Sequence, residues 1–182
     1  ALLRLMKLLG AVLAGGRATR FGSDKALAAL DGRTLIDHAI ASLTAHCDTV
    51  VVVGRTIAAV TCIPDLPFPD LGPLGGIAGA LAYAANHGFD AVLTTACDTP
   101  CVPDAMIAAL RAATPAYAAE APTVGLWSVG LATPLLAYLL DDKPRAIRRW
   151  AETIGAAVVL PGVVLANINT PDDLTAISSS RT

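Results

Sequence analysis

The chain has 182 residues and a mass of 18.5 kDa, a length that suits one domain with a single core. Its formal net charge is −2 and only 4% of its residues are aromatic, which argues against the basic, base-stacking surface of a nucleic-acid-binding protein. Hydrophobic residues make up 54% of the sequence, but the apolar runs are short, and none reaches the roughly 20 residues of a membrane-spanning helix. We therefore expect one domain over residues 1–182, located in the cytoplasm, with small-molecule partners.

The N-terminus and the cysteines both bear on the compartment. No signal-peptide apolar region with a small-residue cleavage site follows Met6, and we expect Met6 to be the natural start and residues 1–5 an extension. The four cysteines form no CxxC pair, and no histidine is spaced as a zinc partner. Free thiols in a reducing cytoplasm are the expected state of Cys47, Cys62, Cys97 and Cys101.

Strands and helices alternate through the first half of the chain. Residues 8–14 are a continuous apolar run that ends at two glycines, which is typical of a strand buried on both faces. Apolar residues at helical spacing predict a helix at 34–46, and a β-branched run predicts a strand at 49–53. A helix, a strand and another helix follow at 75–86, 90–95 and 104–113.

The second half divides into shorter elements. Strands are predicted at 117–119, 124–127, 156–160 and 163–166, and helices at 131–140 and 145–154. A last helix is predicted from Pro171, with Thr170 as its cap. The alternation predicts an α/β fold: a three-layer sandwich with a mostly parallel, Rossmann-like sheet between helices and with the ligand at the carboxyl ends of the strands.

A glycine-rich loop that contains two cations follows the first predicted strand, with the sequence Leu13-Ala14-Gly15-Gly16-Arg17-Ala18-Thr19-Arg20-Phe21-Gly22-Ser23-Asp24-Lys25. Gly15 and Gly16 allow the backbone to approach a ligand and to turn its amides toward an anion, while Arg20 and Lys25 supply positive charge. A polyphosphate would satisfy these groups, and the alternative is an ordinary turn with two solvated cations. The common fingerprints G-x-G-x-x-G and G-K-[ST] are both missing and do not explain the loop.

Four motifs occur in order along the chain. The loop pattern L-A-G-G-x-x-x-R-x-G-x-D-K is followed by Gly72-Pro73-Leu74-Gly75-Gly76-Ile77, by Cys97-Asp98-Thr99-Pro100 and by Asn167-Ile168-Asn169-Thr170-Pro171-Asp172-Asp173-Leu174. Over residues 8–177 the chain resembles the nucleotidyltransferases of the molybdenum cofactor guanylyltransferase family. Asp24 before Lys25 favours this branch over its cytidylyltransferase relatives.

The resemblance implies a reaction and a set of site residues. GMP would be transferred from GTP to the terminal phosphate of molybdopterin, with Mg²⁺ as cofactor and pyrophosphate as product. The implied catalytic residues are Arg20, Lys25 and Asp98. The implied nucleotide contacts are Leu13, Ala14, Gly15, Gly16, Lys25, Gly54, Asp65, Gly72, Pro73, Gly76 and Asp98. Molybdenum enzymes or cofactor-synthesis proteins would be transient protein partners.

Asp98 is the candidate metal ligand. It follows the apolar run at 91–96, at the carboxyl end of a predicted strand, where α/β proteins build their sites. A carboxylate there suits Mg²⁺, and the alternative is a turn aspartate before a proline. Asn167 and Asn169 lie on one side of an extended segment, and the metal, a substrate phosphate or the neighbouring backbone are all open as their partners.

Two further groups concern the substrates. By the resemblance, Asp65 matches a position that contacts guanine, where a carboxylate accepts from N1–H and the 2-amino group, whereas Gly54 falls where relatives carry an asparagine near the base. A basic cluster of Lys143, Arg145, Arg148 and Arg149 reads as a solvated helix face. In the family this region faces the pterin, so Arg145, Arg148, Asn167 and Asn169 would bind the second substrate.

Other functions remain open at this point. A cytidylyl- or sugar-nucleotide transferase could use the same scaffold, because a fold does not fix the acceptor. A dinucleotide-binding oxidoreductase subunit is disfavoured by the missing third glycine of its fingerprint. A binding module without catalysis is disfavoured because Arg20, Lys25 and Asp98 are all present.

Overall fold

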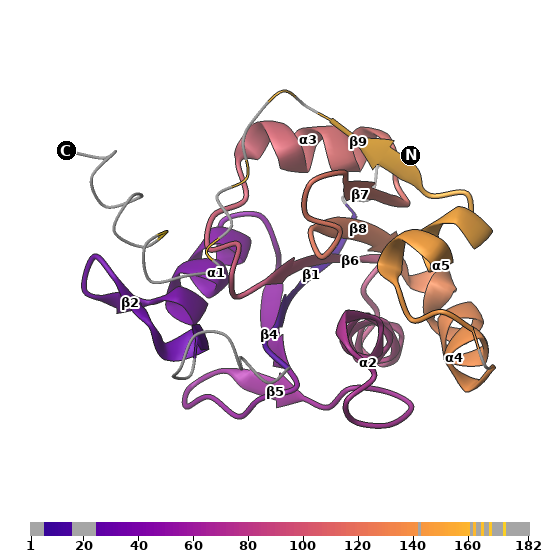
Figure 1. The fold of residues 1–182 in the computed structure, drawn as a ribbon, viewed down its shortest axis with the longest axis horizontal. Coiled ribbons are helices and arrows are strands. Elements are labelled where there is room, and N and C mark those ends of the chain that lie inside the picture. The colour runs from indigo at the N-terminus through magenta and orange to yellow at the C-terminus, as the bar shows by residue number, and fades with distance from the viewer. Residues whose placement is uncertain are drawn as a thin grey trace.

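The computed structural model describes residues 6–15, 25–141 and 143–160, together with residues 162, 165, 168 and 173. In this part of the chain seven strands form one sheet in the order β5-β4-β1-β6-β8-β7-β9 (Figure 1). They are β1 (Leu8–Leu13), β4 (Thr49–Val53), β5 (Thr61–Ile63), β6 (Ala91–Ala96), β7 (Ala116–Ala118), β8 (Gly125–Ser128) and β9 (Ala157–Val159).

All neighbouring strands in this sheet are parallel except those that pair with β8, which runs antiparallel to β6 and β7. β7 and β8 are joined by the short loop 119–124, and Ala118 N–H donates to the Val124 carbonyl over 2.8 Å across its ends. A loop of this length leaves no room for the crossover that parallel neighbours need. β7 therefore runs in the same direction as β6 and β1, and its carboxyl end lies at the same edge of the sheet. The predicted mostly parallel sheet is confirmed.

Helices cover both faces of the sheet, as the predicted three-layer sandwich requires (Figure 1). One face carries α2 (Pro73–Asn86), α4 (Ala132–Leu140) and α5 (Ile147–Thr153), and the other carries α1 (Leu35–Thr44) and α3 (Asp104–Ala112). β1 lies between these layers with all six of its residues buried, which explains its continuous apolar sequence.

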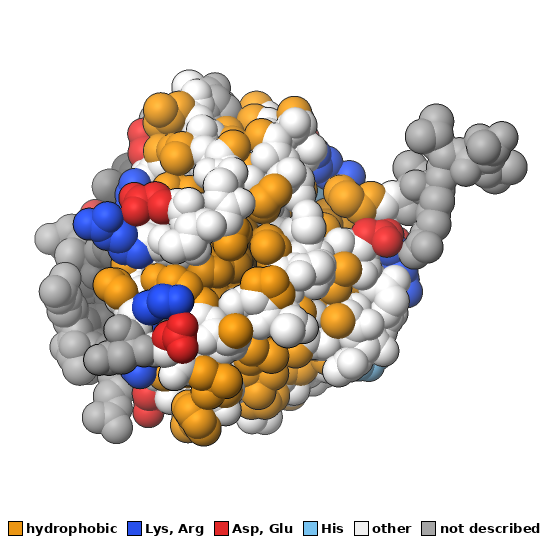
Figure 2. Space-filling model, turned by 90° about the vertical axis from the view of Figure 1, so that its right-hand side faces the viewer, with side chains coloured by type: hydrophobic (Ala, Val, Ile, Leu, Met, Phe, Trp, Pro, Cys, Tyr) orange, Lys and Arg blue, Asp and Glu red, His pale blue; other side chains and the backbone are white. Residues whose placement is uncertain are grey.

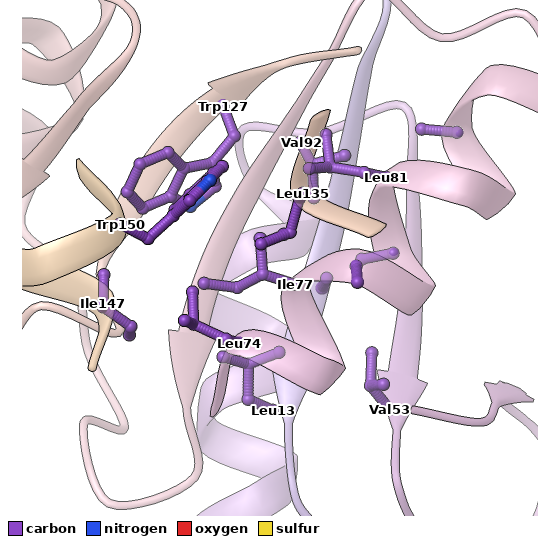
Figure 3. Packing of buried hydrophobic residues seen from close by; sticks show 14 of the residues in the cluster. Leu13, Val53, Leu74, Ile77, Leu81, Val92, Trp127, Leu135, Ile147 and Trp150 are labelled. Carbon is purple, nitrogen blue, oxygen red and sulfur yellow. The ribbon is translucent and has the colours of Figure 1, made fainter. Parts of the chain in front are cut away.

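The core on the α2 face is shown in Figure 3. Leu74 and Ile77 of α2 point toward the sheet above Leu13 at the end of β1. Farther along the sheet Trp127 of β8 packs against Trp150 of α5, with ring centroids 5.0 Å apart. This packing fixes α2 against β1, whose carboxyl end carries the first motif, and α5 against β8.

Most predicted elements are present, with shifts of one or two residues at their ends. The strand at 49–53 has the predicted bounds. The helix predicted at 75–86 begins two residues earlier because Pro73 occupies its first turn, and the helix predicted at 145–154 begins at Ile147, so that Arg145 precedes it. The strand predicted at 163–166 and the last helix from Pro171 fall mostly on residues outside the described part of the chain.

Several short elements were not predicted. β2 (Ala29–Leu30) and β3 (Arg33–Thr34) form a small hairpin, with Asp31 and Gly32 at positive φ in its turn. Two 3-10 helices, η1 (Lys25–Leu27) and η2 (Val129–Leu131), and the three-residue β5 are too short to produce a periodic pattern.

Two expectations about the whole chain can be compared with the structure. All four cysteines are free thiols, as predicted. Burial raises the pKa of the Cys47 thiol to about 12, so this thiol stays protonated at neutral pH. Within the described residues no helix has the length and apolar character needed to cross a membrane.

Candidate functional site

The carboxyl ends of β1 and β4 bring two predicted segments together. Leu13 pairs with Val53 in the sheet, and Ala14 N–H extends the ladder by donating to the Val53 carbonyl over 3.0 Å. Gly15 and Gly54 are the next residues in the two segments that leave β1 and β4. They meet backbone to backbone: a Cβ on Gly54 would lie 2.7 Å from the Gly15 Cα.

The end of β6 brings in the third segment from the other side of β1. Leu13 pairs with Ala96, and Cys97 N–H donates to the Leu13 carbonyl over 3.4 Å. Gly15 lies two residues beyond Leu13 and Asp98 two residues beyond Ala96, so they occupy corresponding positions at this edge. Gly15, at the start of the predicted loop, and the predicted metal ligand thus follow the ends of adjacent parallel strands, where α/β proteins build their sites.

A pocket of about 660 Å³ opens beside Gly15 and Gly54. Its volume lies within the roughly 300–1,000 Å³ of small-molecule sites. Its lining includes many of the predicted nucleotide contacts, namely Leu13, Gly15, Gly54, Asp65, Gly72, Pro73 and Gly76. Ala14 and Asp98 are not part of the lining. Gly16 and Arg20 lie outside the described residues, and Lys25 is described for its backbone only.

Asp65 is held at the pocket wall by a close approach of α2. At Gly79 an added Cβ would collide with the Pro64 carbonyl oxygen, so only glycine lets the helix lie against this segment. Leu66 N–H donates to the Gly75 carbonyl over 3.0 Å, which fixes the residue after Asp65. The carboxylate of Asp65 consequently lies against the part of the pocket formed by Gly15 and Gly54, which we call the glycine wall. Its Oδ1 is 3.2 Å from where a Cβ on Gly54 would stand.

The environment of Asp65 perturbs its carboxyl group. Burial, and secondly the negative charge of Asp70 on the same pocket, raise the pKa of Asp65 above its ordinary value. A carboxylate that has lost part of its hydration gains more from a ligand that donates hydrogen bonds to it. The pocket therefore favours a ligand with N–H groups facing Asp65.

Asp98 lies half-buried in the turn after β6, where hydrogen bonds hold its position. The hydroxyl of Thr99, which is fully buried, donates to Asp98 Oδ1 over 3.4 Å. The buried Thr95 hydroxyl donates to the Thr99 carbonyl over 3.2 Å, and Thr99 N–H donates to the Ala96 carbonyl over 3.0 Å. These contacts fix the backbone on both sides of the carboxylate.

The donor set around Asp98 is compatible with a hard divalent cation. The described residues contain no group of three or more His, Cys, Asp or Glu that could hold a metal ion by themselves. Mg²⁺ does not need such a group, because it usually binds one or two carboxylates and completes its shell with water and substrate phosphates.

Ile168 connects the turn that carries Asp98 with the segment around Leu30 and Leu35. Its N–H donates to the Asp98 carbonyl over 2.8 Å, and its side chain is fully buried against Leu30 and Leu35. Leu30 belongs to the hairpin that follows η1, which starts at Lys25. Although Asn167 and Asn169 are outside the described residues, the residue between them is bound to Asp98. Sequence reasoning missed Ile168 itself, whose only signal is an apolar residue between two asparagines.

The predicted basic cluster lies on the α4 and α5 side of the molecule. Figure 2 shows this face, with Lys and Arg side chains beside Asp and Glu side chains on its left half. Two cations are paired on the surface: Lys143 with Asp141 over 2.8 Å and Arg149 with Glu152 over 3.2 Å. The reading of a solvated face fits these two residues.

Arg148 and Arg145 differ from these surface pairs. Arg148 Nη2 donates to the Ala119 carbonyl, which directly follows β7. Because β7 is parallel to β6, this anchors Arg148 at the sheet edge that also carries Asp98. Arg145 is exposed in the segment before α5.

The pocket residues that were not predicted include three with charged or hydroxyl side chains: Arg55, Thr56 and Asp70. Arg55 and Thr56 directly follow Gly54 at the end of β4, so their position after a strand-ending glycine was the available signal. Asp70 lies in the loop before α2 with φ of 62°, and no sequence pattern distinguishes it from an ordinary loop residue.

A family model described as the MobA-like NTP transferase domain matches residues 10–158. The chain belongs to this MobA-like family. The molybdenum cofactor guanylyltransferase of Rhodobacter capsulatus is 36% identical over an alignment 183 residues long. The alignment covers 93% of this chain and 94% of that relative. The MobA-like chain is thus a nucleotidyltransferase, as the four motifs predicted.

Solved structures of other MobA-like and related proteins share the fold. Molybdopterin-guanine dinucleotide biosynthesis protein A from Archaeoglobus fulgidus has a TM-score of 0.74 and 23% identity, over 96% of this chain and 100% of that chain. 2-C-methyl-D-erythritol 4-phosphate cytidylyltransferase from Thermus thermophilus has a TM-score of 0.71 and 18% identity, over 97% and 100%. Rv0371c from Mycobacterium tuberculosis, solved in complex with manganese, has a TM-score of 0.61 and 16% identity, over 96% and 100%. The fold alone does not select the base.

Proposed function

We propose that this MobA-like chain transfers GMP from GTP to the terminal phosphate of molybdopterin. The observation that carries the proposal is the match, at 36% identity over 93% of the chain, to a molybdenum cofactor guanylyltransferase. The pocket agrees with it, because the Asp65 carboxylate lies on a glycine wall where a flat base can pack. Guanine presents two adjacent hydrogen-bond donors, N1–H and the 2-amino group, and a carboxylate can accept a hydrogen bond from each of them.

The proposed reaction is a phosphoryl-group displacement. An oxygen of the molybdopterin phosphate attacks the α-phosphorus of GTP, the bond from that phosphorus to the bridging oxygen breaks, and pyrophosphate leaves with the electron pair. A phosphomonoester has a second pKa of about 6 and is already largely dianionic at pH 7, so no general base is required. In agreement, none of the three histidines, all of them in the described ranges, lines the pocket.

The remaining task is to align two anions and neutralise charge. Gly15 and Gly16 let backbone amides approach the phosphates, and Arg20 and Lys25 supply positive charge to the transition state. Asp98, with Asn167 or Asn169 as a second ligand, would hold Mg²⁺, which when bound neutralises charge on the phosphate oxygens. The relative solved with manganese supports a divalent cation for this fold.

The order of strands separates the two proposed substrate sites. The pocket lies at the ends of β1 and β4, whereas Arg148 is anchored at the end of β7. β6, which ends at Asp98, lies between β1 and β7 in the sheet. We place molybdopterin on the β7 side, held by Arg145, Arg148, Asn167 and Asn169, so that its phosphate reaches GTP beside Asp98.

Three broader expectations accompany this function. We propose that residues 1–182 act as one domain and that the reaction takes place in the cytoplasm. The product is a cofactor that molybdenum enzymes need, so transient contact with those enzymes or with cofactor-synthesis proteins is expected.

The test is pyrophosphate release from GTP and molybdopterin over a Mg²⁺ series, with CTP as the competing nucleotide. Turnover should require nucleotide, acceptor and metal together and should strongly favour GTP. In melts with equal concentrations of GTP and CTP, the tighter-binding GTP should raise Tm more, and at a hundredfold excess over its Kd it should stabilise the fold by about 2.7 kcal/mol. Equal or faster turnover with CTP would make the chain a cytidylyltransferase on the same scaffold.

A further inference from the structure

We infer that Arg55 is a specificity residue that reads the O6 and N7 edge of guanine, opposite the carboxylate of Asp65. The inference rests on the proposed function, because it requires the base of GTP to lie in the pocket that both side chains line. Arg55 thereby becomes a base contact, separate from the cations that face the phosphates.

The backbone of Arg55 is fixed where the pocket begins. Gly54 N–H donates to the Ile63 carbonyl over 3.0 Å and extends the β4–β5 ladder by one residue. Arg55 is the next residue, is half-buried, and is the one Lys or Arg in the lining that the structure describes. The described lining therefore contains one cationic side chain, that of Arg55, and two carboxyl groups, those of Asp65 and Asp70.

Position 54 itself has no side chain to offer to a base. Gly54 has φ of 80°, and a Cβ there would lie 2.7 Å from the Gly15 Cα and 2.9 Å from the Gly15 nitrogen. A side chain would push the two loops apart, so side-chain hydrogen-bond donors at the end of β4 come from the residues that follow, Arg55 and Thr56. Of these two, only Arg55 has the planar fork that can bind two acceptors at once.

The chemistry of the two side chains matches guanine. An ionised carboxylate only accepts hydrogen bonds and a guanidinium only donates them. Guanine places the donors N1–H and 2-amino next to the acceptors O6 and N7, and a guanidinium binds O6 and N7 in a bidentate fashion. Adenine has an acceptor at N1 and a donor at the 6-position, the reverse of this pattern, and would leave both side chains facing the wrong groups.

Cytosine is the base that this pair excludes least. Its 4-amino group can donate to Asp65, and its N3 can accept from an arginine. Cytosine has no N7, however, so a contact to N7 belongs to a purine alone. The nucleotide 7-deaza-GTP, which replaces N7 with a carbon, isolates this one contact.

The experiment measures Kd by calorimetry for GTP and 7-deaza-GTP with the wild-type chain, Arg55→Ala and Arg55→Lys. Arg55→Ala should weaken GTP binding by about ten- to a hundredfold, in line with the discrimination of a bidentate arginine pair. Wild type should bind 7-deaza-GTP more weakly than GTP, and this difference should vanish in Arg55→Ala. Arg55→Lys should not restore it, because lysine lacks the planar fork.

The control is Arg111→Ala, an exposed arginine of α3 that donates to the His46 carbonyl, away from the pocket. It should bind both nucleotides as wild type does, and melts should show all variants folded. The inference is overturned if Arg55→Ala weakens GTP, 7-deaza-GTP and CTP equally, or if Arg55→Lys restores binding, since Arg55 would then act on the phosphates. If the wild-type chain binds CTP more tightly than GTP, the proposed function itself is overturned.

Discussion

The backbone N–H of Ile168 donates to the carbonyl oxygen of Asp98 over 2.8 Å. This bond joins the turn after β6 to the segment that carries Asn167 and Asn169, the two proposed partners of the metal. It uses the carbonyl group of the Asp98 main chain and does not involve the carboxylate. The side chain of Asp98 can therefore be changed without removing the bond that holds the two segments together.

Asp98→Asn is expected to abolish Mg²⁺-dependent turnover while barely weakening GTP binding without metal. Asparagine keeps the size of aspartate and one acceptor oxygen but lacks the negative charge that a hard dication prefers. The measurement is pyrophosphate release over a Mg²⁺ series. An unchanged metal dependence would exclude Asp98 as ligand, because a turn aspartate can be replaced by asparagine with little effect.

Thr99→Val should raise the Mg²⁺ concentration needed for half-maximal turnover. Thr99 is fully buried and its hydroxyl donates to Asp98 Oδ1, so valine removes the bond at nearly constant shape. A net hydrogen bond of about 1 kcal/mol corresponds to roughly a fivefold change. Thr99→Ser keeps the hydroxyl and should behave as wild type. If both variants lose activity at every Mg²⁺ concentration alike, Thr99 serves packing and does not orient Asp98.

The central sheet could be predicted because its strands are buried on both faces. Residues 8–14 are a continuous apolar run, residues 49–53 and 90–95 are rich in apolar and β-branched residues, and the helices between them show helical spacing. Parallel strands end at one edge, so the motifs after these strands were expected to meet, and Gly15 and Asp98 do occupy neighbouring strand ends.

The parts that were missed depend on contacts between distant segments. β5 has three residues and no fully buried one, so its identity as a strand comes from pairing with β4. Arg55 becomes a pocket residue only because Gly54 packs on Gly15. Ile168 becomes an anchor only because the hairpin of β2 and β3 lies beside the Asp98 turn. No local pattern encodes these relationships.

Gly54→Ala should lower Tm and abolish GTP binding, because the added methyl group would overlap the Gly15 backbone. The matched control is Gly88→Ala at the end of α2. Gly88 has φ of 70°, close to the 80° of Gly54, but an added Cβ there meets nothing within 4 Å. Both variants carry a left-handed alanine, which costs about 1–2 kcal/mol. Only Gly54→Ala should lose more stability than this and lose binding; equal effects in the two variants would contradict the close contact.

Asp65→Asn is expected to stabilise the nucleotide-free protein at neutral pH. The pKa of Asp65 is raised in the folded state, so between its unfolded and folded pKa values the folded protein binds more protons, and stability falls as pH rises through that window. Above this pH range Asp65 is ionised, and the wild-type protein has lost that part of its stability. Asp65→Asn has no titrating group at this position, so its stability does not fall for this reason. Melts from acidic to neutral pH should show wild type losing more stability than Asp65→Asn. Parallel pH curves would contradict a perturbed Asp65.

The same substitution should change which base is bound. Asp65 offers two acceptor oxygens to the N1–H and 2-amino groups of guanine, whereas the amide of Asp65→Asn accepts at one atom and donates at the other. Its donor would then face the 2-amino donor of guanine. Loss of a hydrogen bond to a charged partner, about 1.5–3 kcal/mol, weakens GTP binding by about ten- to 150-fold. Xanthine keeps N1–H but has a carbonyl in place of the 2-amino group, so it pairs with asparagine and XTP should gain affinity as GTP loses it.

The matched control is Asp70→Asn, which removes one negative charge from the same pocket at an exposed position and should leave the preference for GTP over XTP intact. Calorimetry with GTP and XTP on the three proteins decides the matter: if Asp65→Asn and Asp70→Asn weaken GTP equally and neither gains XTP, Asp65 contributes only charge to the pocket and does not contact the base edge.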